Sequence, residues 1–469
     1  MSREEEMLQC WIGSLPGEIT LEIVSQLDRP SLLSLSICSK RMNDLTAPTL
    51  YSIFEHSDHD LRALPLLIRT ILKRPDLAQY VKKFIAFNGN AGSMDMMAVD
   101  DFDRIEEALY RLRPLPVDVE QWLHSVWSGR WSALTALLLS LLPKIEVFDL
   151  IYFGSSEDQE FRFINTILER ARTLQEAGQL ADPYSMARLR YVSLKDSSYD
   201  DWCLIRPENM YPYLHLLSIE KYSFEGFGEN DKLGPEDWAL QGDGDGGFRA
   251  TTLVLQGKFL YTDSFPTFLR SFKSLKRFHC DYWGGFFPKT LADGIAQLSN
   301  CLEELSVTHS EPGYVFHSYD NTMNSILPLS GFTALKILEA TAHSLLGGEL
   351  KIVLPIKLEK AGCHVSYSRK YDMYYHQQTI QNFVKRMPPS LKHLTLLDCS
   401  EGIIDVLFEL LKDNVLTNLR TLTISIYRGR NEDVMKKFIA VSCTEYEWRK
   451  KFSERSVDLC WVDLSPLVV

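Results

Sequence analysis

Only a few residues of this 469-residue chain have types and spacings that could bind a metal ion. Asp243 and Asp245 lie in the run GDGDGG and match the start of a calcium loop, in which carboxylates alternate along a tight turn. The third ligand and the closing Glu at the required spacing are absent. We therefore predict a solvated turn over residues 242–247 and no calcium site.

Two other pairs could bind zinc, but neither has the required partners. His56 and His59 have no matching pair of Cys or His downstream. Cys363 and His364 are adjacent, and neighbours on an extended chain point to opposite faces, which disfavours shared ligation. The sequence also has neither a phosphate-binding Gly-rich loop nor a Gly-x-Ser-x-Gly nucleophile motif. We expect no metal, no cofactor and no enzymatic active site.

Charge and cysteine usage restrict the class of protein. The net charge of −12 argues against a nucleic-acid partner, because phosphate contacts need a basic field. The N-terminus lacks an apolar stretch, and the run 133–142 is too short to span a bilayer, so we expect no secretory signal, no membrane partner and a buried helix at 133–142. Nine cysteines without a Cys-x-x-Cys pair are typical of reduced thiols, which predicts a cytoplasmic and/or nuclear location.

Residues 15–51 carry more apolar side chains than so small a unit can bury. Leu15 and Pro16 open a predicted helix whose aliphatic residues recur at helical spacing. Turn and cap residues at 28–31 separate it from a second predicted helix over 32–38, and a third follows over 40–51. We expect the surplus apolar surface to be covered by the rest of the chain or by a partner.

This segment resembles the F-box in its Leu-Pro opening, acidic-Ile pair, spaced aliphatics and Lys-Arg pair. The matching residues are Leu15, Pro16, Glu18, Ile19, Ile23, Leu27, Leu32, Leu35, Cys38, Lys40, Arg41, Asn43 and Leu50. One departure is Met42, where many family members have Trp. The resemblance implies docking on a Skp-family adaptor and, through it, on a cullin–RING scaffold. The adaptor-binding set carried over from the family, part of which must instead form the segment's own core, is Leu15, Pro16, Ile19, Ile23, Leu27, Leu32, Leu35 and Cys38.

A second pattern recurs through the rest of the chain: aliphatic, two variable residues, aliphatic, one variable residue, aliphatic. Clear copies begin at Leu189, Leu214, Leu275, Leu302, Leu335, Leu391 and Leu419, and weaker copies begin at Val81, Ile145 and Ala250. The last two aliphatics of a copy are two residues apart, so on a strand they point to one buried face. Predicted helices lie between copies, at 161–177, 288–298, 379–387 and 403–412. This is the strand pattern of a leucine-rich repeat, whose units stack in parallel.

We therefore predict an α/β fold with an F-box over 12–54, a helical connector over 55–75 and a curved, irregular leucine-rich-repeat solenoid over 76–469. Parallel strands would form the concave face, and helices and loops the convex face. Uneven spacing predicts inserted loops at 242–247 and within 345–375. The alternative is an ordinary parallel α/β domain whose strands look alike.

The variable positions of the strand copies face away from the core and form the predicted binding surface. The predicted target-binding residues mix both charges, hydroxyls and imidazoles, which suits a protein or peptide ligand; they are Arg277, His279, Asp281, Glu304, Ser306, Thr308, Glu339 and His393, with Thr341 and Thr395 beside them. An aromatic group could anchor a partner at the rim or pack under a loop: Tyr282, Trp283, Phe286 and Phe287.

The predicted function is the substrate-recognition subunit of a Skp–cullin–F-box ubiquitin ligase. In this role the F-box docks on the adaptor, the repeats bind an unknown target protein, and other subunits supply catalysis, so the chain contributes proximity and orientation. Two alternatives stay open. The chain could be a non-catalytic F-box scaffold that delivers no target, or a repeat protein in structure or signalling whose helical segment is only a cap.

Overall fold

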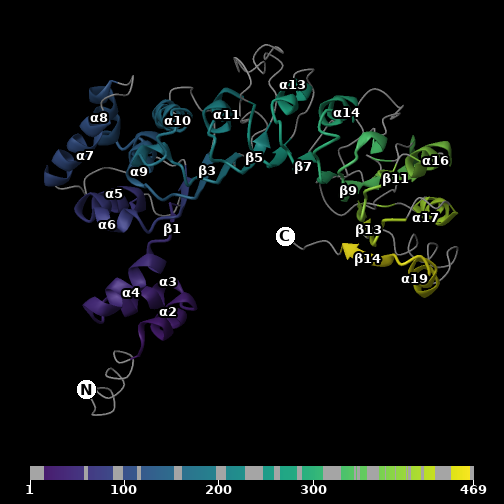
Figure 1. Cartoon of the computed structure of the whole chain (residues 1–469), viewed down its shortest axis with the longest axis horizontal. Helices are drawn as coiled ribbons and strands as arrows, with labels where there is room; N and C mark the ends of the chain where they lie inside the picture. Colours follow the sequence, from purple (N-terminus) through teal and green to yellow (C-terminus); the bar gives the residue numbers. More distant parts are fainter. Residues whose placement is uncertain are drawn as a thin grey trace. The chain divides into compact units, whose positions relative to one another are not determined.

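The computed structural model shown in Figure 1 describes residues 15–56, 62–87, 99–112, 118–152, 161–196, 207–227, 247–257, 265–282, 288–309, 329–342, 345, 349–355, 369–374, 377–385, 387–397, 399, 403–412, 417–427 and 445–464. The chain divides into two compact units, Met1–Ser223 and Phe224–Val469.

The first unit begins with three helices, α2 (Gly17–Ser25), α3 (Arg29–Ser36) and α4 (Lys40–Leu50). Strands and helices then alternate as β1 (Ile53–Glu55), α5 (Ala63–Lys73), α6 (Pro75–Ala78), β2 (Lys83–Phe87), α7 (Val99–Arg111), α8 (Val119–Trp127), α9 (Trp131–Leu141), β3 (Val147–Tyr152), α10 (Arg162–Glu176), the 3₁₀ turn η2 (Pro183–Ser185), β4 (Tyr191–Asp196) and α11 (Pro207–Leu214). The division between the units falls within β5 (Lys221–Phe227).

The second unit continues the alternation with shorter helices. Its elements are β6 (Thr252–Gly257), α13 (Phe265–Arg270), β7 (Arg277–Tyr282), α14 (Pro288–Ala296), β8 (Glu304–His309), the 3₁₀ turn η3 (Leu329–Gly331), β9 (Ile337–Thr341), β10 (Glu349–Pro355), β11 (Arg369–Tyr374), α16 (Gln377–Lys385), β12 (His393–Leu397), α17 (Ile403–Lys412), β13 (Thr421–Tyr427), α19 (Glu445–Ser453) and β14 (Asp458–Leu464).

Within each unit the parallel strands follow one another in chain order. The order is β1-β2-β3-β4-β5 in the first unit and β6-β7-β8-β9-β12-β13-β14 in the second, while β10 and β11 form a separate antiparallel pair. Figure 1 shows the second unit's helices α13, α14, α16, α17 and α19 on one side of its strands. An α/β fold with open parallel strands and an N-terminal helical segment is confirmed.

A shared backbone acceptor aligns the starts of neighbouring strands. The carbonyl oxygen of Lys276, which precedes β7, accepts hydrogen bonds from Glu303 N at 2.7 Å and Glu304 N at 2.9 Å, at the start of β8. The same sharing by one oxygen recurs at Ser52, Lys82, Glu146, Arg190, Thr251, Glu303, Lys336 and Lys392. Residues at equivalent positions of successive strands therefore lie side by side.

The predicted strand copies match the observed strands, with one correction. Nine of the ten predicted copies coincide with strands, but the copy at Leu214 is wrong because Leu214 ends α11. Glu220 N and Lys221 N donate to Arg190 O at the start of β5, which puts Tyr222 and Phe224 in the aliphatic positions. Both rings are buried, so aromatic residues replace the expected aliphatics in this strand.

Several strands were not predicted. β1 has only three residues, and it pairs with β2 although it precedes the predicted start of the repeats at 76. At β14, Ser456 occupies the position at which the pattern has its first aliphatic residue, and its φ is 61°. The β10–β11 hairpin lies inside the predicted insert at 345–375. The domain boundaries at 54 and 75 stay predictions.

The predicted helices at 161–177, 288–298, 379–387 and 403–412 correspond to α10, α14, α16 and α17. The apolar run at 133–142 forms most of α9, in which ten of eleven residues are buried. Apolar side chains occur on every face of α9, as expected for a helix that packs against three others, α5, α8 and α10.

A buried carboxylate joins α5 to α7. Asp101 on α7 is 1% exposed, and its oxygens lie 3.0 Å from Arg69 Nε and 2.8 Å from Lys73 Nζ on α5. Removing one partner of a buried ion pair leaves the remaining charges unpaired, which costs more than the loss of an exposed pair.

We predict that Asp101→Asn lowers the free energy of unfolding of the first unit by about 2 kcal/mol or more. The matched control is Asp76→Asn, because Asp76 pairs with Arg74 at 2.7 Å while both side chains are more than half exposed. The control should leave stability unchanged. Urea denaturation of both variants measures the difference, and equal stability of the two variants would contradict the prediction.

Candidate functional site

The three-helix segment, α2 to α4, has polar groups that fix its helix starts. Ser39 precedes α4, and its Oγ accepts a hydrogen bond from Met42 N at 3.2 Å, which satisfies one free N–H of the first turn. Arg41 Nη2 donates to Leu15 O at 2.6 Å and so ties the start of α2 to α4. α4 packs on both α2 and α3.

The segment has a small core. Val24, Leu32, Met42 and Ala47 are its buried apolar side chains. Met42, the departure from the family's Trp, is 3% exposed, so a flexible thioether side chain fills this position between the helices. These few buried groups leave most of the apolar side chains of α2 and α3 outside the core.

Burial divides the predicted adaptor-binding set. Leu32 is 4% exposed and belongs to the segment's own core, so we remove it from the candidate surface. The half-buried members are Leu15, Leu27 and Leu35, and the exposed members are Pro16, Ile19, Ile23 and Cys38.

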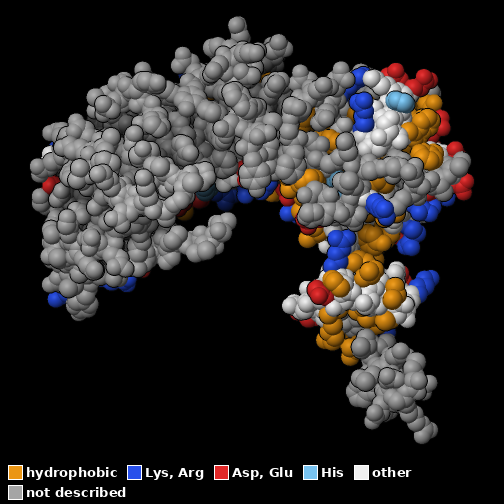
Figure 2. Space-filling model, turned by 180° about the vertical axis from the view of Figure 1, so that it is seen from behind, with side chains coloured by type: hydrophobic (Ala, Val, Ile, Leu, Met, Phe, Trp, Pro, Cys, Tyr) orange, Lys and Arg blue, Asp and Glu red, His pale blue; other side chains and the backbone are white. Residues whose placement is uncertain are grey.

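Three further apolar side chains of this segment are exposed and were missed by the sequence analysis: Leu21, Leu33 and Ile37. Ile19 and Ile23 are four residues apart, as are Leu33 and Ile37, so each pair shares one side of its helical turn. Ten large hydrophobic side chains are exposed among the described residues, and five of them lie between residues 19 and 37. Figure 2 shows hydrophobic groups at the surface of this segment. Such a concentration of exposed apolar side chains is typical of interaction surfaces.

The predicted target-binding residues share one face of the second unit's strands, which we call the strand face. The register places Arg277, Glu304 and His393 at one level across the strands, with Ile337 between the last two. A second level holds His279, Ser306 and Glu339, and a third holds Asp281 and Thr308. The structure therefore brings the predicted set together, and target binding stays a prediction.

Hydrogen bonds cross the strand face from strand to strand. Ser306 Oγ donates to Glu339 Oε2 at 3.2 Å, and Thr308 Oγ1 donates to Asp281 Oδ1 at 3.0 Å. His279 Nε2 lies 3.4 Å from Glu304 Oε1. These cross-strand contacts hold polar groups in place on a partly solvated surface.

Two neighbouring side chains change the predicted binding surface. Ile337 is 37% exposed and lies between Glu304 and His393 on the strand face. Its place at a variable position of the strand pattern could have identified it as a surface residue. Tyr282 is buried, so it belongs to the core and is not a rim anchor. Trp283, Phe286 and Phe287 lie outside the described residues.

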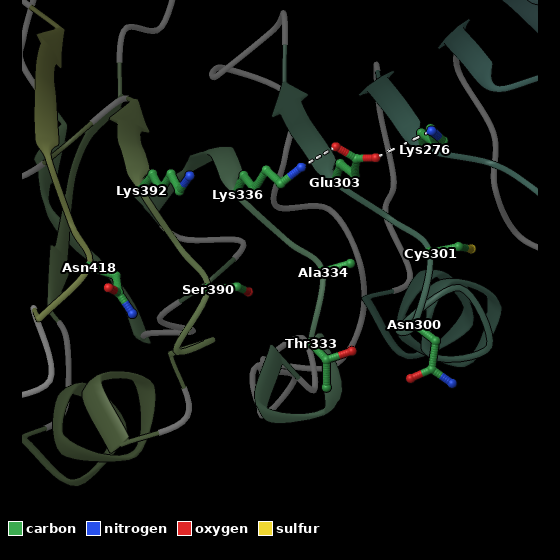
Figure 3. A pocket seen from close by; sticks show the side chains of 10 residues that line it. All are labelled: Lys276, Asn300, Cys301, Glu303, Thr333, Ala334, Lys336, Ser390, Lys392 and Asn418. Atoms are coloured by element: carbon green, nitrogen blue, oxygen red, sulfur yellow. Dashed lines mark hydrogen bonds and ion pairs between the residues drawn. The ribbon is translucent and has the colours of Figure 1, made fainter.

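A shallow pocket of about 470 Å³ lies beside the starts of β7, β8, β9, β12 and β13. The residues immediately before these strands form the strand-start row: Lys276, Glu303, Lys336, Lys392 and Arg420. Figure 3 shows Glu303 between Lys276 and Lys336, with Lys392 next along the row. Asn300, Thr333, Ser390 and Asn418 line the same pocket from the preceding turns.

The pocket's electrostatics are set by its lysines. A hydrogen bond from Lys336, with the charges of Lys336 and Lys276, lowers the pKa of the Glu303 carboxyl, so it stays ionised at neutral pH. Partial burial raises the pKa of the Cys301 thiol, which disfavours the reactive thiolate. The pocket therefore presents the ammonium groups of Lys276, Lys336 and Lys392 beside one ionised carboxylate, so cations outnumber anions among its lining residues.

The candidate metal residues give no cluster in the described part of the chain. His56 is buried, and its Nδ1 lies 3.1 Å from Phe87 O, in a hydrogen bond between β1 and β2. Asp243, Asp245, His59, Cys363 and His364 lie outside the described residues. Nowhere in the described ranges do three His, Cys, Asp or Glu side chains gather as metal ligands. No described helix is long and apolar enough to cross a membrane.

Comparison with known proteins identifies the helical segment. Residues 12–47 match the F-box domain family. The chain is also similar to a solved structure described as the crystal structure of the Rad7 and Elc1 complex in yeast, with 11% sequence identity and a TM-score of 0.32, over 94% of this chain and 91% of that chain. A likeness of this degree carries no argument. No curated protein matches the chain. An F-box domain implies an adaptor-binding role in a ubiquitin ligase, with a Skp-family protein as the adaptor.

The division of the segment into core and surface predicts different costs for two substitutions. Leu32→Ala should lower the stability of the three-helix segment by about 2–4 kcal/mol, because it leaves a cavity. Ile37→Ala should change stability by less than about 0.5 kcal/mol, because Ile37 is 80% exposed. Amide hydrogen exchange in α3 and α4 measures both, and equal protection in the two variants would contradict the division.

Proposed function

We propose that this chain is the substrate-recognition subunit of a Skp–cullin–F-box ubiquitin ligase. The F-box docks on a Skp-family adaptor, and the adaptor links the chain to a cullin–RING scaffold. The second unit binds a target protein and presents it for ubiquitylation. The chain is not an enzyme in this role; it raises the effective concentration of the target near catalytic groups in other subunits.

One observation carries the proposal. The F-box match covers the same helices that expose Ile19, Ile23, Leu33 and Ile37. These four side chains are 43–80% exposed, so a partner that covers them gains part of the about 1.5–3 kcal/mol that full burial of each contributes. The half-buried residues Leu15, Leu27 and Leu35 form the edge of the same surface in the proposed complex.

We assign the repeats to the irregular leucine-rich class. Support comes from the recurring aliphatic pattern, which coincides with nine parallel strands, and from the helices that follow several of them. In this class the face opposite the helices is the usual partner-binding surface. The strand face, with cross-strand pairs such as Ser306–Glu339 and an exposed Ile337, is the proposed target-binding site.

The adaptor-binding role predicts that Ile23→Asp combined with Ile37→Asp weakens capture of a purified Skp-family adaptor by at least about 100-fold. Two charged groups would replace apolar contacts, and a loss of about 3 kcal/mol corresponds to this factor. The matched control is Leu66→Asp combined with Leu180→Asp, because these two side chains are also exposed but lie outside the F-box. Biolayer interferometry with the immobilised adaptor measures both.

The same reagents separate the alternatives. Capture of the adaptor together with a cullin by the native chain supports the ligase role, whereas capture of the adaptor alone supports a scaffold that delivers no target. Capture of neither protein would contradict the adaptor-binding role and favour a stand-alone repeat protein. Equal loss in the control variant would show that the apolar surface of the F-box is not the contact.

A further inference from the structure

The strand-start rows of the two units differ in their charge pattern. In the first unit the charged members of the row alternate in sign: Lys82, Glu146, Arg190 and Glu220. Ion pairs join Lys82 to Glu146 at 3.7 Å and Arg190 to Glu220 at 3.5 Å. In the second unit the alternation stops after Lys336, so that three cations stand in succession: Lys336, Lys392 and Arg420. The charges of the first unit's row therefore balance, whereas the row of the second unit has an excess of positive charge.

The carboxylate of Glu303 cannot neutralise the cationic end. Its two oxygens lie near Lys276 Nζ and Lys336 Nζ, so it is already shared by two ammonium groups. Among the described residues, neither Lys392 nor Arg420 has an ion-pair partner; Arg420 is exposed and Lys392 is half-buried. Like charges on adjacent strands destabilise a sheet, because the strands are only about 4.8 Å apart. An external anion would remove this repulsion.

The pocket next to these cations has neutral hydrogen-bonding walls. Ser390 Oγ donates to Leu335 O at 2.7 Å, and Asn418 Nδ2 donates to Pro389 O at 2.6 Å, so both turns are held in place from the previous repeat. The Oδ1 of Asn418 and the hydroxyl of Thr333 add polar groups beside the cations. Lysine side chains have several rotatable bonds, whereas the backbone of Lys336 and Lys392 is held by the shared carbonyl oxygens.

From this arrangement we propose that the cationic end of the strand-start row, formed by Lys336, Lys392 and Arg420, docks a short acidic peptide segment of a partner protein. The three cations precede neighbouring strands and so span about 10 Å, which an extended peptide of about six residues covers with residues to spare on both sides. The carboxylates of the peptide lie against the three cations. The uncharged side chains between them lie against the neutral pocket wall that includes Ser390 and Asn418.

A peptide fits this surface better than a nucleic acid or a small anion. The chain carries a net charge of −12, so a long polyanion is repelled beyond the local row, whereas a short segment feels the local charges within a Debye length of about 8–10 Å. A free phosphate would contact only one or two of the three cations. An extended peptide contacts the three cations and the pocket wall together.

The test is selection of binders by the purified full chain from a displayed library of random peptides about six residues long, the length set by the row. Asp and Glu should be enriched among the binders. The variant Lys392→Glu with Arg420→Glu should abolish this enrichment and weaken binding of the best synthetic peptide by at least about tenfold in fluorescence polarisation. Raising the ionic strength from about 0.1 M to about 1 M should also weaken binding, because the Debye length falls from about 10 Å to about 3 Å.

The matched control is Arg104→Glu with Lys385→Glu, which changes the net charge equally at two exposed helix positions outside the pocket. Retained binding by the control and lost binding by the row variant support the proposal. No acidic enrichment, or equal loss in both variants, overturns it. Tighter binding of a single-stranded oligonucleotide than of the best peptide, or displacement of the peptide by inorganic phosphate at equal concentration, would replace the peptide with that ligand.

The assignment of the acidic partner as a ubiquitylation target rests on the proposed function, but the binding itself does not. Peptide selection uses the chain without adaptor, and adaptor capture uses it without peptide. Circular dichroism and adaptor capture by the row variant verify that it is folded. Loss of adaptor binding in the F-box variant with intact peptide binding would overturn the ligase role alone.

Discussion

The fold depends on one backbone interaction, the carbonyl oxygen at each strand start that accepts two N–H groups from the next strand. Each such oxygen uses both of its lone pairs, and it fixes two consecutive residues of the following strand at once. A slip of one residue would turn every side chain of that strand to the opposite face, which would expose Leu305 or Leu338 and bury Glu304 or Glu339. The positions of the strand face and of the strand-start row follow from this constraint.

The sequence was sufficient for elements that are defined by local spacing. The six-residue pattern predicts the strands because its two later aliphatics must share a buried face, and it fails at β5, where Tyr222 and Phe224 occupy those positions. It also fails at β14, where Ser456 breaks the pattern. The charge imbalance of the strand-start row could not be predicted, because its members become neighbours only through the register of strands that are far apart in the chain. The split of the F-box aliphatics into core and surface likewise depends on how α4 packs on α2 and α3.

The two candidate surfaces differ in chemistry, and the difference suits different kinds of partner. The F-box surface is aliphatic, and apolar contacts give free energy that depends little on salt and favours long-lived complexes. The strand face and the strand-start row are polar and charged, so contacts there give specificity and fast association more than affinity. In the proposed role, a stable attachment to the adaptor and an exchangeable contact with the target can therefore belong to one chain without competing for the same residues.

Ser390 donates a hydrogen bond to Leu335 O although 55 residues separate them, whereas Thr308 and Asp281 on adjacent strands are only 27 residues apart. The longer interval contains the β10–β11 hairpin, yet Lys392 still meets Lys336 at the strand start. The number of residues between two strands therefore does not affect how their first residues line up in the strand-start row. An insert at this place can therefore differ in length while the charged residues at the neighbouring strand starts keep their positions.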